Sequence, residues 1–182
     1  MFSYVREDIK MYLEKSNHLS AVKKFFYLIF CQELHAVLIY RFGRWSKYEF
    51  KIPIISILFR MIYFVLRKMS EMLIGVAIWP ESKIGPGLKI EHFGGIYIMA
   101  QMGKHCRISQ QVTIGHIGGF KGGGCPVLGD NVYIGAGAKV LGEIRIGNNV
   151  KIGANAVVIQ DVPDNAIAVG VPAVIKFPKQ EQ

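Results

Sequence analysis

The sequence predicts a parallel β-helix that follows an α-helical region, and two observations carry this fold class. Composition changes near Gly75: residues 1–75 contain one of the seven prolines and two of the 20 glycines, and residues 76–182 contain the rest. The second observation is an internal repeat of six residues, which matches neither the 3.6-residue period of a helix nor the two-residue period of a strand. A hexapeptide period is typical of a parallel β-helix. We therefore expect a helical region over 1–75 and a β-helix over 76–182.

The repeat begins at Ile78 and runs through 13 hexads. The residue four positions after the start of each hexad is small or aliphatic, and we expect it to pack near a corner. Three hexads complete one triangular coil, and stacked coils bury a continuous core. Each hexad opens with an apolar residue that we expect to point inward: Ile78, Ile84, Ile90, Ile96, Met102, Ile108, Ile114, Leu128, Ile134, Val140, Ile146, Ile152 and Val158.

The repeat is interrupted once, between Gly119 and Leu128. Eight extra residues, 120–127 with the sequence FKGGGCPV, separate the flanking hexads. A coil can extrude a loop without losing its register, and glycines let such a loop approach a ligand closely. Because His116 lies at the base of this loop, we expect the loop to have a functional role rather than to be a tolerated insertion.

The helical region contains no predicted targeting or spanning segment. Charged and apolar residues alternate through Met1–Lys15, so a signal-peptide core is absent there. The apolar stretches Phe25–Tyr40 and Ile52–Leu66 are both shorter than the ~20 residues of a spanning helix. Three widely spaced cysteines form neither a disulfide framework nor a CxxC motif, which favours a reducing compartment. We expect a cytoplasmic protein, with peripheral contact at the inner face of the membrane left open.

The chain is basic, with 22 Lys and Arg against 13 Asp and Glu and a net charge of +9. No aromatic–basic motif of a nucleic-acid-binding protein accompanies this charge. We therefore expect no nucleic-acid partner, and the positive charge favours an anionic partner of another kind.

Several motifs resemble the serine O-acetyltransferase group of hexapeptide-repeat acyltransferases. They are ELHAVLIYRFGRW (33–45), IGPGLKIEHFGGIYI (84–98), VTIG (112–115), IGAGAKVLGEIRIGNNVKIGANAVV (134–158) and VPDNAIAVGVPA (162–173). The resemblance implies a left-handed β-helix, acetyl-CoA as co-substrate without a metal, and a homotrimer whose site lies between subunits. It leaves open a hexamer joined through the helical region.

Acetyl transfer to an alcohol needs a base for the hydroxyl proton, and histidine suits this role near neutral pH. His92, in the glycine-rich segment EHFGG, is the expected base. His116 is the second candidate, for binding the acceptor or polarising the thioester. Two rival interpretations are weaker: Cys125 as an acyl-accepting nucleophile, and a metal lyase using His92, His105 and His116.

The coenzyme is expected on the later coils. Small residues at Ala136, Gly137 and Ala154 leave room for pantetheine against the backbone, and Lys139, Lys151 and Lys176 are candidates for phosphate contacts. The resemblance itself implies coenzyme contacts at Ala136, Lys151 and Ala154.

The acceptor half of the site departs from the group's pattern. Glu91 replaces an Asp, Ala77 replaces the Asp that orients the histidine, and Gly124-Cys125 replace an Arg-His pair that helps hold the amino acid. A carboxylate acceptor needs a cation when it is desolvated. We therefore expect a sugar hydroxyl as acceptor, as in colanic-acid and capsule-type O-acetyltransferases of surface-polysaccharide synthesis, with Glu91, Gly124 and Cys125 near it. The alternative is serine O-acetylation in cysteine biosynthesis.

Overall fold

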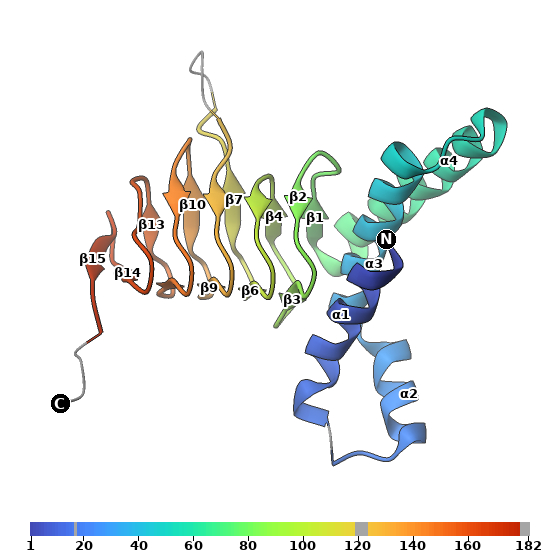
Figure 1. Cartoon of the computed structure of the whole chain (residues 1–182), viewed down its shortest axis with the longest axis horizontal. Coiled ribbons are helices and arrows are strands. Elements are labelled where there is room, and N and C mark those ends of the chain that lie inside the picture. Colours follow the sequence, from blue (N-terminus) through green and yellow to red (C-terminus); the bar gives the residue numbers. More distant parts are fainter. Residues whose placement is uncertain (17, 119–123, 179–182) are drawn as a thin grey trace.

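A computed structural model describes residues 1–16, 18–118 and 124–178 of the chain. A triangular β-helix occupies residues 76–176, with the helical region at its N-terminal end and the C-terminus at the other (Figure 1). The predicted fold class, a parallel β-helix with an N-terminal α-helical region, is confirmed.

Three parallel sheets form the sides of the prism, and we call them A, B and C. Sheet A holds β1 (Val76–Ile78), β4 (Ile96–Ile98), β7 (Thr113–Gly115), β10 (Lys139–Leu141) and β13 (Val157–Val158). Sheet B holds β2 (Lys83–Ile84), β5 (Gln101–Met102), β8 (Val127–Leu128) and β11 (Arg145–Ile146). Sheet C holds β3 (Lys89–Ile90), β6 (Arg107–Ile108), β9 (Tyr133–Ile134), β12 (Lys151–Ile152), β14 (Ile167–Val169) and the antiparallel β15 (Val174–Lys176).

The core is the one that the repeat predicts. All 13 residues that open the hexads are buried, from Ile78 at 5% exposure to Val158 at 0%. Most of the small or aliphatic residues four positions later are buried as well, and Gly94 and Gly118 are the exceptions. Inward-facing aliphatic side chains on three sides therefore fill the prism from end to end.

The register differs from the predicted one at a single coil. Ile98, rather than Ile96, pairs in register with Ile78 on one side and Ile114 on the other. The chain takes eight residues from Ile90 to Ile98, where the next coil takes six from Ile108 to Ile114. Two extra residues therefore enlarge the corner that contains His92, and the following corner is shorter by two.

The interruption of the repeat leaves the sheets intact. Thr113 pairs with Lys139, 26 residues later, whereas Lys139 pairs with Val157, 18 residues later. The ladder of sheet A therefore continues across the interruption without a change of register. Residues 120–123 of the predicted loop lie outside the described residues.

One row of corners is built from residues in the left-handed region that are not glycine. Asn131, Asn149 and Asn165 have φ of 56–61°, a conformation that asparagine tolerates better than most residues. Their side chains form a ladder: the Asn131 amide donates to Asn149 Oδ1 over 3.1 Å, and Asn149 donates to Asn165 Oδ1 over 3.0 Å. This ladder holds three successive coils in register.

The helical region contains α1 (Phe2–Leu13), α2 (Ala21–Phe30), α3 (Gln32–Arg44) and α4 (Pro53–Met69). A 3₁₀ turn, Glu14–Ser16, follows α1, and π-helical turns follow α3 (Trp45–Glu49) and α4 (Ser70–Ile74). Within the described ranges no single helix is long and apolar enough to cross a membrane. The bent pair Ala21–Phe30 with Gln32–Glu49 meets that test on length and composition alone.

Helix α3 closes the N-terminal end of the prism. Ala36, Val37 and Tyr40 belong to the same buried cluster as the β-helix core. The Tyr40 hydroxyl donates to Ser82 O over 2.6 Å, and Arg41 donates to Ile84 O and Gly85 O over 2.6 Å each. The first coil therefore rests on α3 through both apolar packing and hydrogen bonds.

Candidate active site

The candidate site residues fall mainly on two edges of the prism. The His92 edge is the row of corners where the chain passes from sheet C to sheet A, and it contains Glu91, His92, Ala136, Gly137 and Ala154. The His116 edge is the row where the chain passes from sheet A to sheet B, and it contains His116, Gly124 and Cys125. Sheet A lies between the two edges.

The enlarged corner carries His92 into solvent. His92 and Phe93 are exposed and Glu91 is partly exposed. Gly94 and Gly95 follow with φ of 101° and 68°, a left-handed pair that side chains with a Cβ rarely adopt. The glycines of the EHFGG segment therefore turn the longer corner back into β4. Among the described residues His92 has no hydrogen-bond partner, and Ala77 on β1 supplies no carboxylate to orient its ring.

The coenzyme candidates continue along the same edge. Backbone hydrogen bonds stack its corners: Gln111 N donates to Gly94 O, Gly137 N to Gln110 O and Asn155 N to Ala136 O, over 2.8–2.9 Å. Stacked strands lie about 4.8 Å apart, so Ala136 and Ala154 lie about 10 and about 14 Å along the axis from the level of His92. A linear coenzyme lying along this edge would pass the predicted small residues in order.

The three lysines predicted to contact phosphates lie in different settings. Lys139 on β10 is partly buried, and its ammonium donates to Gln111 O over 2.7 Å and to Thr113 Oγ1 over 3.1 Å. Both partners are neutral, so the positive charge is not compensated by them. Lys151 on β12 and Lys176 on β15 are exposed on the side of sheet C.

The His116 edge holds a carboxylate that sequence reasoning missed. His116 and Ile117 are exposed, whereas Gly124 and Cys125 are partly buried. A Cβ on Gly124 would meet the Glu143 side chain at 2.7 Å. The neighbouring corner hydrogen bond, Gly142 N to Gly115 O over 2.9 Å, explains this contact because it stacks the two segments. No sequence motif marks Glu143. Only a count of residues per coil, corrected for the insertion, would have placed it beside Gly124.

The two histidines do not meet within one chain. The register that pairs Ile98 with Ile114 sets His116 level with Ala100, eight positions beyond His92 and at the other side of sheet A. Among the described residues neither imidazole donates to or accepts from another group. His92 and His116 therefore lie on separate edges of the same chain.

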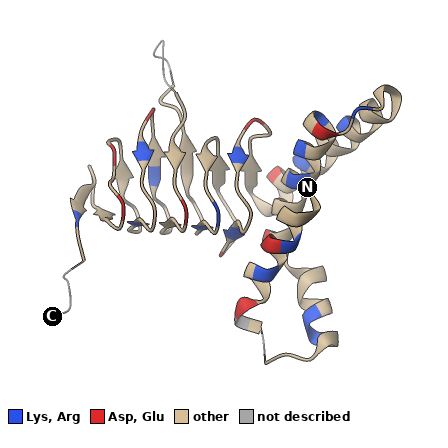
Figure 2. Ribbon diagram, viewed as in Figure 1, with Lys and Arg blue, Asp and Glu red and all other residues tan. Residues whose placement is uncertain are grey.

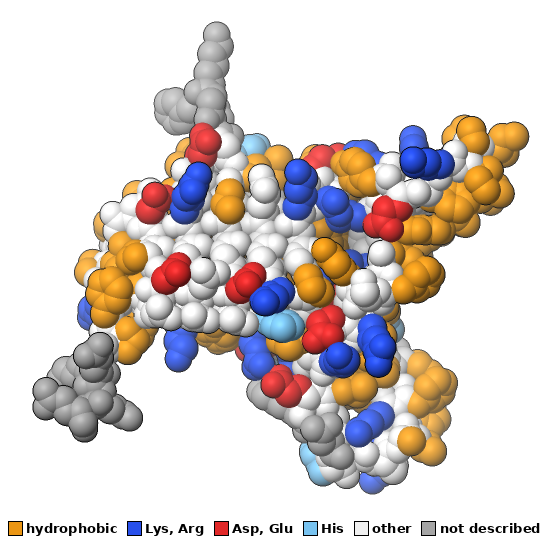
Figure 3. Space-filling view, in the orientation of Figure 1, with side chains coloured by type: hydrophobic (Ala, Val, Ile, Leu, Met, Phe, Trp, Pro, Cys, Tyr) orange, Lys and Arg blue, Asp and Glu red, His pale blue; other side chains and the backbone are white. Residues whose placement is uncertain are grey.

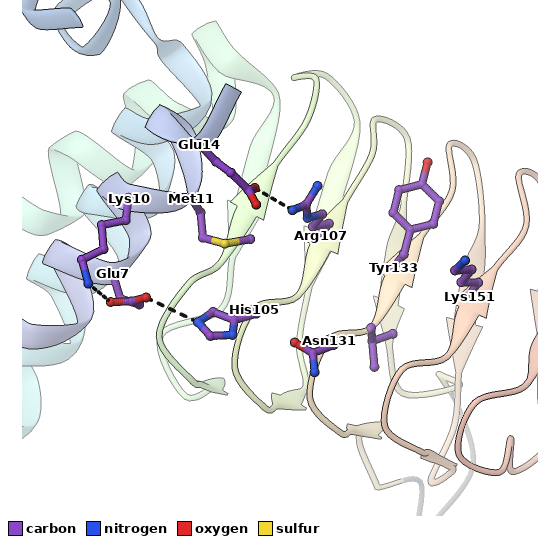
Figure 4. A pocket seen from close by; sticks show the side chains of 10 residues that line it. Glu7, Lys10, Met11, Glu14, His105, Arg107, Asn131, Tyr133 and Lys151 are labelled. Carbon is purple, nitrogen blue, oxygen red and sulfur yellow. Dashed lines mark hydrogen bonds and ion pairs between the residues drawn. The ribbon is translucent and has the colours of Figure 1, made fainter. Parts of the chain in front are cut away.

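His105 lies elsewhere, in a hollow of about 640 Å³ between α1 and sheet C (Figure 4). Its Nε2 lies 3.5 Å from Glu7 Oε1, a partner that the sequence did not suggest. Arg107 donates to Glu14 over 2.7 Å and Lys10 to Glu7 over 2.8 Å, so the charges of this hollow pair mostly with each other. Lys151 is the predicted site residue that lines it. No cluster of three metal-ligating side chains occurs in the described part of the chain.

Comparisons with known proteins identify relatives of this chain. The model of the bacterial transferase hexapeptide family (six repeats) matches residues 125–160. The serine acetyltransferase of Synechococcus elongatus is 37% identical over 94% of this chain and 67% of its own, and that of Helicobacter pylori J99 is 39% identical over 85% and 86%. The crystal structure of the Neisseria gonorrhoeae serine acetyltransferase matches all of this chain and 68% of its own, with a TM-score of 0.81 and 32% identity.

These findings correct the predicted acceptor. The expectation of a sugar hydroxyl in surface-polysaccharide synthesis is wrong, because the relatives that match most of the chain are serine acetyltransferases. The expectation depended on Gly124 and Cys125, two positions on one edge. The relatives are similar across the helical region as well as the β-helix. The predicted membership of the hexapeptide-repeat acyltransferases is confirmed.

Proposed function

The chain belongs to the serine acetyltransferase family, and we propose that it transfers the acetyl group of acetyl-CoA to the hydroxyl of L-serine. The family makes the chain an acetyl-CoA-dependent O-acetyltransferase. Solved family members include one complex with serine and one with CoA, at 32% and 29% identity. These complexes support the assignment of both substrates to this chain.

One observation carries the proposal. The only exposed histidine on the His92 edge, within the described residues, lies on the same row of corners as the small residues Ala136, Gly137 and Ala154. A coenzyme that follows this row brings its thioester end to the enlarged corner. His92 is then the group available to accept a proton there.

The reaction that follows from this arrangement is a direct transfer. His92 removes the proton from the serine hydroxyl as the oxygen attacks the thioester carbonyl. The carbon–sulfur bond breaks, and the CoA thiolate leaves and takes up the proton from the imidazolium. The products are O-acetylserine and CoA, and the histidine is neutral again.

Two charged residues suit the ends of the amino acid. Glu91, beside His92, is a partner for the serine ammonium. Lys139 keeps an uncompensated positive charge on sheet A, available for the serine carboxylate or a coenzyme phosphate. Gly124 supplies no cation, and an arginine at that position would meet the Glu143 carboxylate.

The two edges suggest how a trimer completes the site. In a cyclic trimer with sheet A facing the three-fold axis, one edge of each prism meets the opposite edge of its neighbour, since such interfaces are heterologous. The His92 edge of one copy then faces the His116 edge of the next. His116, Gly124 and Cys125 would thereby reach the acceptor bound at the neighbour's His92.

The direct test is CoA release from acetyl-CoA with L-serine as acceptor, followed by a thiol reagent, with O-acetylserine identified by mass spectrometry. We expect release that depends on L-serine and saturates with it. Release that is no faster with L-serine than with water would overturn the proposal, as would a product without acetylserine.

A further inference from the structure

Helices α2 and α4 present an unusual amount of apolar surface to solvent. No residue of α2 is buried, and Ser56 is the one buried residue of α4. We call the exposed apolar side chains of these helices the apolar end surface. It consists of Val22, Phe25, Phe26, Tyr27, Ile29 and Phe30 on α2 and of Ile54, Ile55, Ile57, Leu58, Met61, Ile62, Phe64, Val65 and Met69 on α4.

This surface lies at the end of the molecule opposite the C-terminus. Figure 3 shows hydrophobic side chains gathered there in two groups, one over each helix. Ile54 is 83% exposed, Phe30 74% and Phe64 62%. Single exposed apolar residues are ordinary, but a large group of them on one helix marks a surface that something covers. A hollow of about 430 Å³ on α4, lined by Ile57, Arg60, Met61, Phe64 and Val65, lies within it.

Helices α2 and α4 themselves carry only positive charges. Residues 15–32 and 50–70 contain no Asp or Glu, and their charged residues are Lys15, Lys23, Lys24, Lys51, Arg60, Arg67 and Lys68. Figure 2 shows the basic residues on α2 and α4. Arg67 and Lys68 donate to Glu71 over 2.8 Å each. In the described residues, Lys23, Lys24, Lys51 and Arg60 have no carboxylate partner.

We propose that the apolar end surface binds the surface of an anionic phospholipid bilayer. Helices that combine aromatic and aliphatic side chains with lysine and arginine lie in the plane of the bilayer interface, with the apolar side chains among the acyl chains and the cations at the phosphates. α2 and α4 have this composition. A second copy of the chain is the weaker occupant, because it would bring unpaired cations of both copies to one interface.

The bound orientation leaves most of both edges accessible. The helices stand at one end of the prism (Figure 1), His92 lies in the coil next to them, and the His92 and His116 edges extend from there toward the other end. If the proposed trimer forms with parallel prisms, three apolar end surfaces face the same way. Three linked contacts then bind a membrane far more tightly than one.

The test is co-sedimentation of the full chain with phosphatidylcholine vesicles, with and without phosphatidylglycerol. We expect binding that requires phosphatidylglycerol and weakens as salt rises. The combined variant Ile54→Ser, Met61→Ser and Phe64→Ser should reduce binding about ten-fold or more. Its matched control, Val127→Ser with Ile159→Ser and Val174→Ser, removes exposed apolar residues of the β-helix and should leave binding unchanged.

The charge is tested separately. Arg60→Gln should weaken binding about five-fold per chain, whereas Lys83→Gln, which removes an exposed cation of sheet B, should not. No binding to either vesicle, or equal binding by the triple variant and the wild type, would overturn the proposal. Absence of vesicle binding together with a lower oligomer mass of the triple variant in light scattering would replace the bilayer with a second copy of the chain as the occupant of this surface.

Discussion

Arg41 Nε donates to Asp8 Oδ2 over 2.8 Å, and both side chains are buried, with 4% and 0% of their surface exposed. Asp8 Oδ1 also accepts from the backbone N–H groups of Gly87 and Leu88, over 2.8 and 2.9 Å. One carboxylate thus joins α1, α3 and the first coil of the β-helix. A buried pair with its remaining donors and acceptors satisfied specifies how these three elements meet.

Asp8→Asn should lower the free energy of unfolding by about 3–5 kcal/mol, because it leaves the buried Arg41 guanidinium without its counter-charge. Urea unfolding at neutral pH measures the change. The matched control is Glu14→Gln, which breaks the half-exposed pair with Arg107 and should cost about 1 kcal/mol or less. Equal effects of the two variants would contradict the role given to Asp8.

Gly43→Ala should be destabilising by about 1–3 kcal/mol through overpacking. A Cβ on Gly43 of α3 would overlap the Tyr63 ring of α4, whose burial raises the pKa of its hydroxyl to about 12. At an exposed helix position, Gly→Ala raises the free energy of unfolding by up to about 1 kcal/mol. The sign of the change at Gly43 therefore distinguishes the two cases. Gly118→Ala, where no described residue lies within 4 Å of the added Cβ, is the control for thermal unfolding and should be near neutral.

His92→Ala should lower kcat with L-serine by roughly 10²–10⁴-fold, with little change in the affinity for CoA, because it removes the proposed general base. Steady-state kinetics and CoA binding by calorimetry separate the two effects. His105→Ala, at the hollow beside α1, should keep kcat near the wild-type value. An unchanged kcat in the His92 variant would exclude it from proton transfer.

The proposed meeting of two edges in the trimer predicts complementation between variants. His92→Ala and His116→Ala should each be weakly active alone. Random mixed trimers of the two should recover about a quarter of the wild-type sites, because one interface in four then pairs two intact edges. The test is to co-express the two variants, purify the mixed trimers and measure the acetyltransferase activity per trimer. Failure to recover activity would argue that both histidines act within one chain.

The cysteines should differ in reactivity in the native protein. Burial raises the pKa of the Cys106 thiol to about 11 and raises the pKa of the Cys31 and Cys125 thiols as well. Near pH 8 all three are therefore mainly protonated, and access decides the order of reaction. Cys125 is partly exposed and the other two are buried, so a disulfide reagent should label Cys125 first. Fast labelling of Cys106 before unfolding would contradict the packing of the core.

Much of the fold could be predicted because the β-helix repeats its requirements. Each coil needs an inward-facing aliphatic residue at the same place. The six-residue spacing of aliphatic residues along the sequence therefore predicts the whole β-helix. The misplacement at Ile96 has a simple cause. Ile96 and Ile98 are both buried, and a compensated shift of two residues leaves no trace in a list of aliphatic positions.

The site was less accessible to sequence reasoning. His92 and the small coenzyme-edge residues follow from the repeat together with the resemblance. The neighbours of Gly124 and His105 do not, because Glu143 and Glu7 reach them through the stacking of coils and the docking of α1. The prediction of a sugar acceptor was wrong because it rests on two altered positions, whereas the similarity to serine acetyltransferases extends over nearly the whole chain.

The ladder of sheet A is unbroken at the interruption, so the segment inserted there is not needed to hold the coils together. Thr113 pairs with Lys139 as closely as Lys139 pairs with Val157, although eight more residues intervene. Changes of length or composition between these strands therefore cost the scaffold little. The corners of the His92 edge, along which we propose that the coenzyme lies, are by contrast part of the coils themselves. In the proposed arrangement, substitutions in the one inserted segment alter the acceptor side of the site and leave the corners that hold the acetyl donor unchanged.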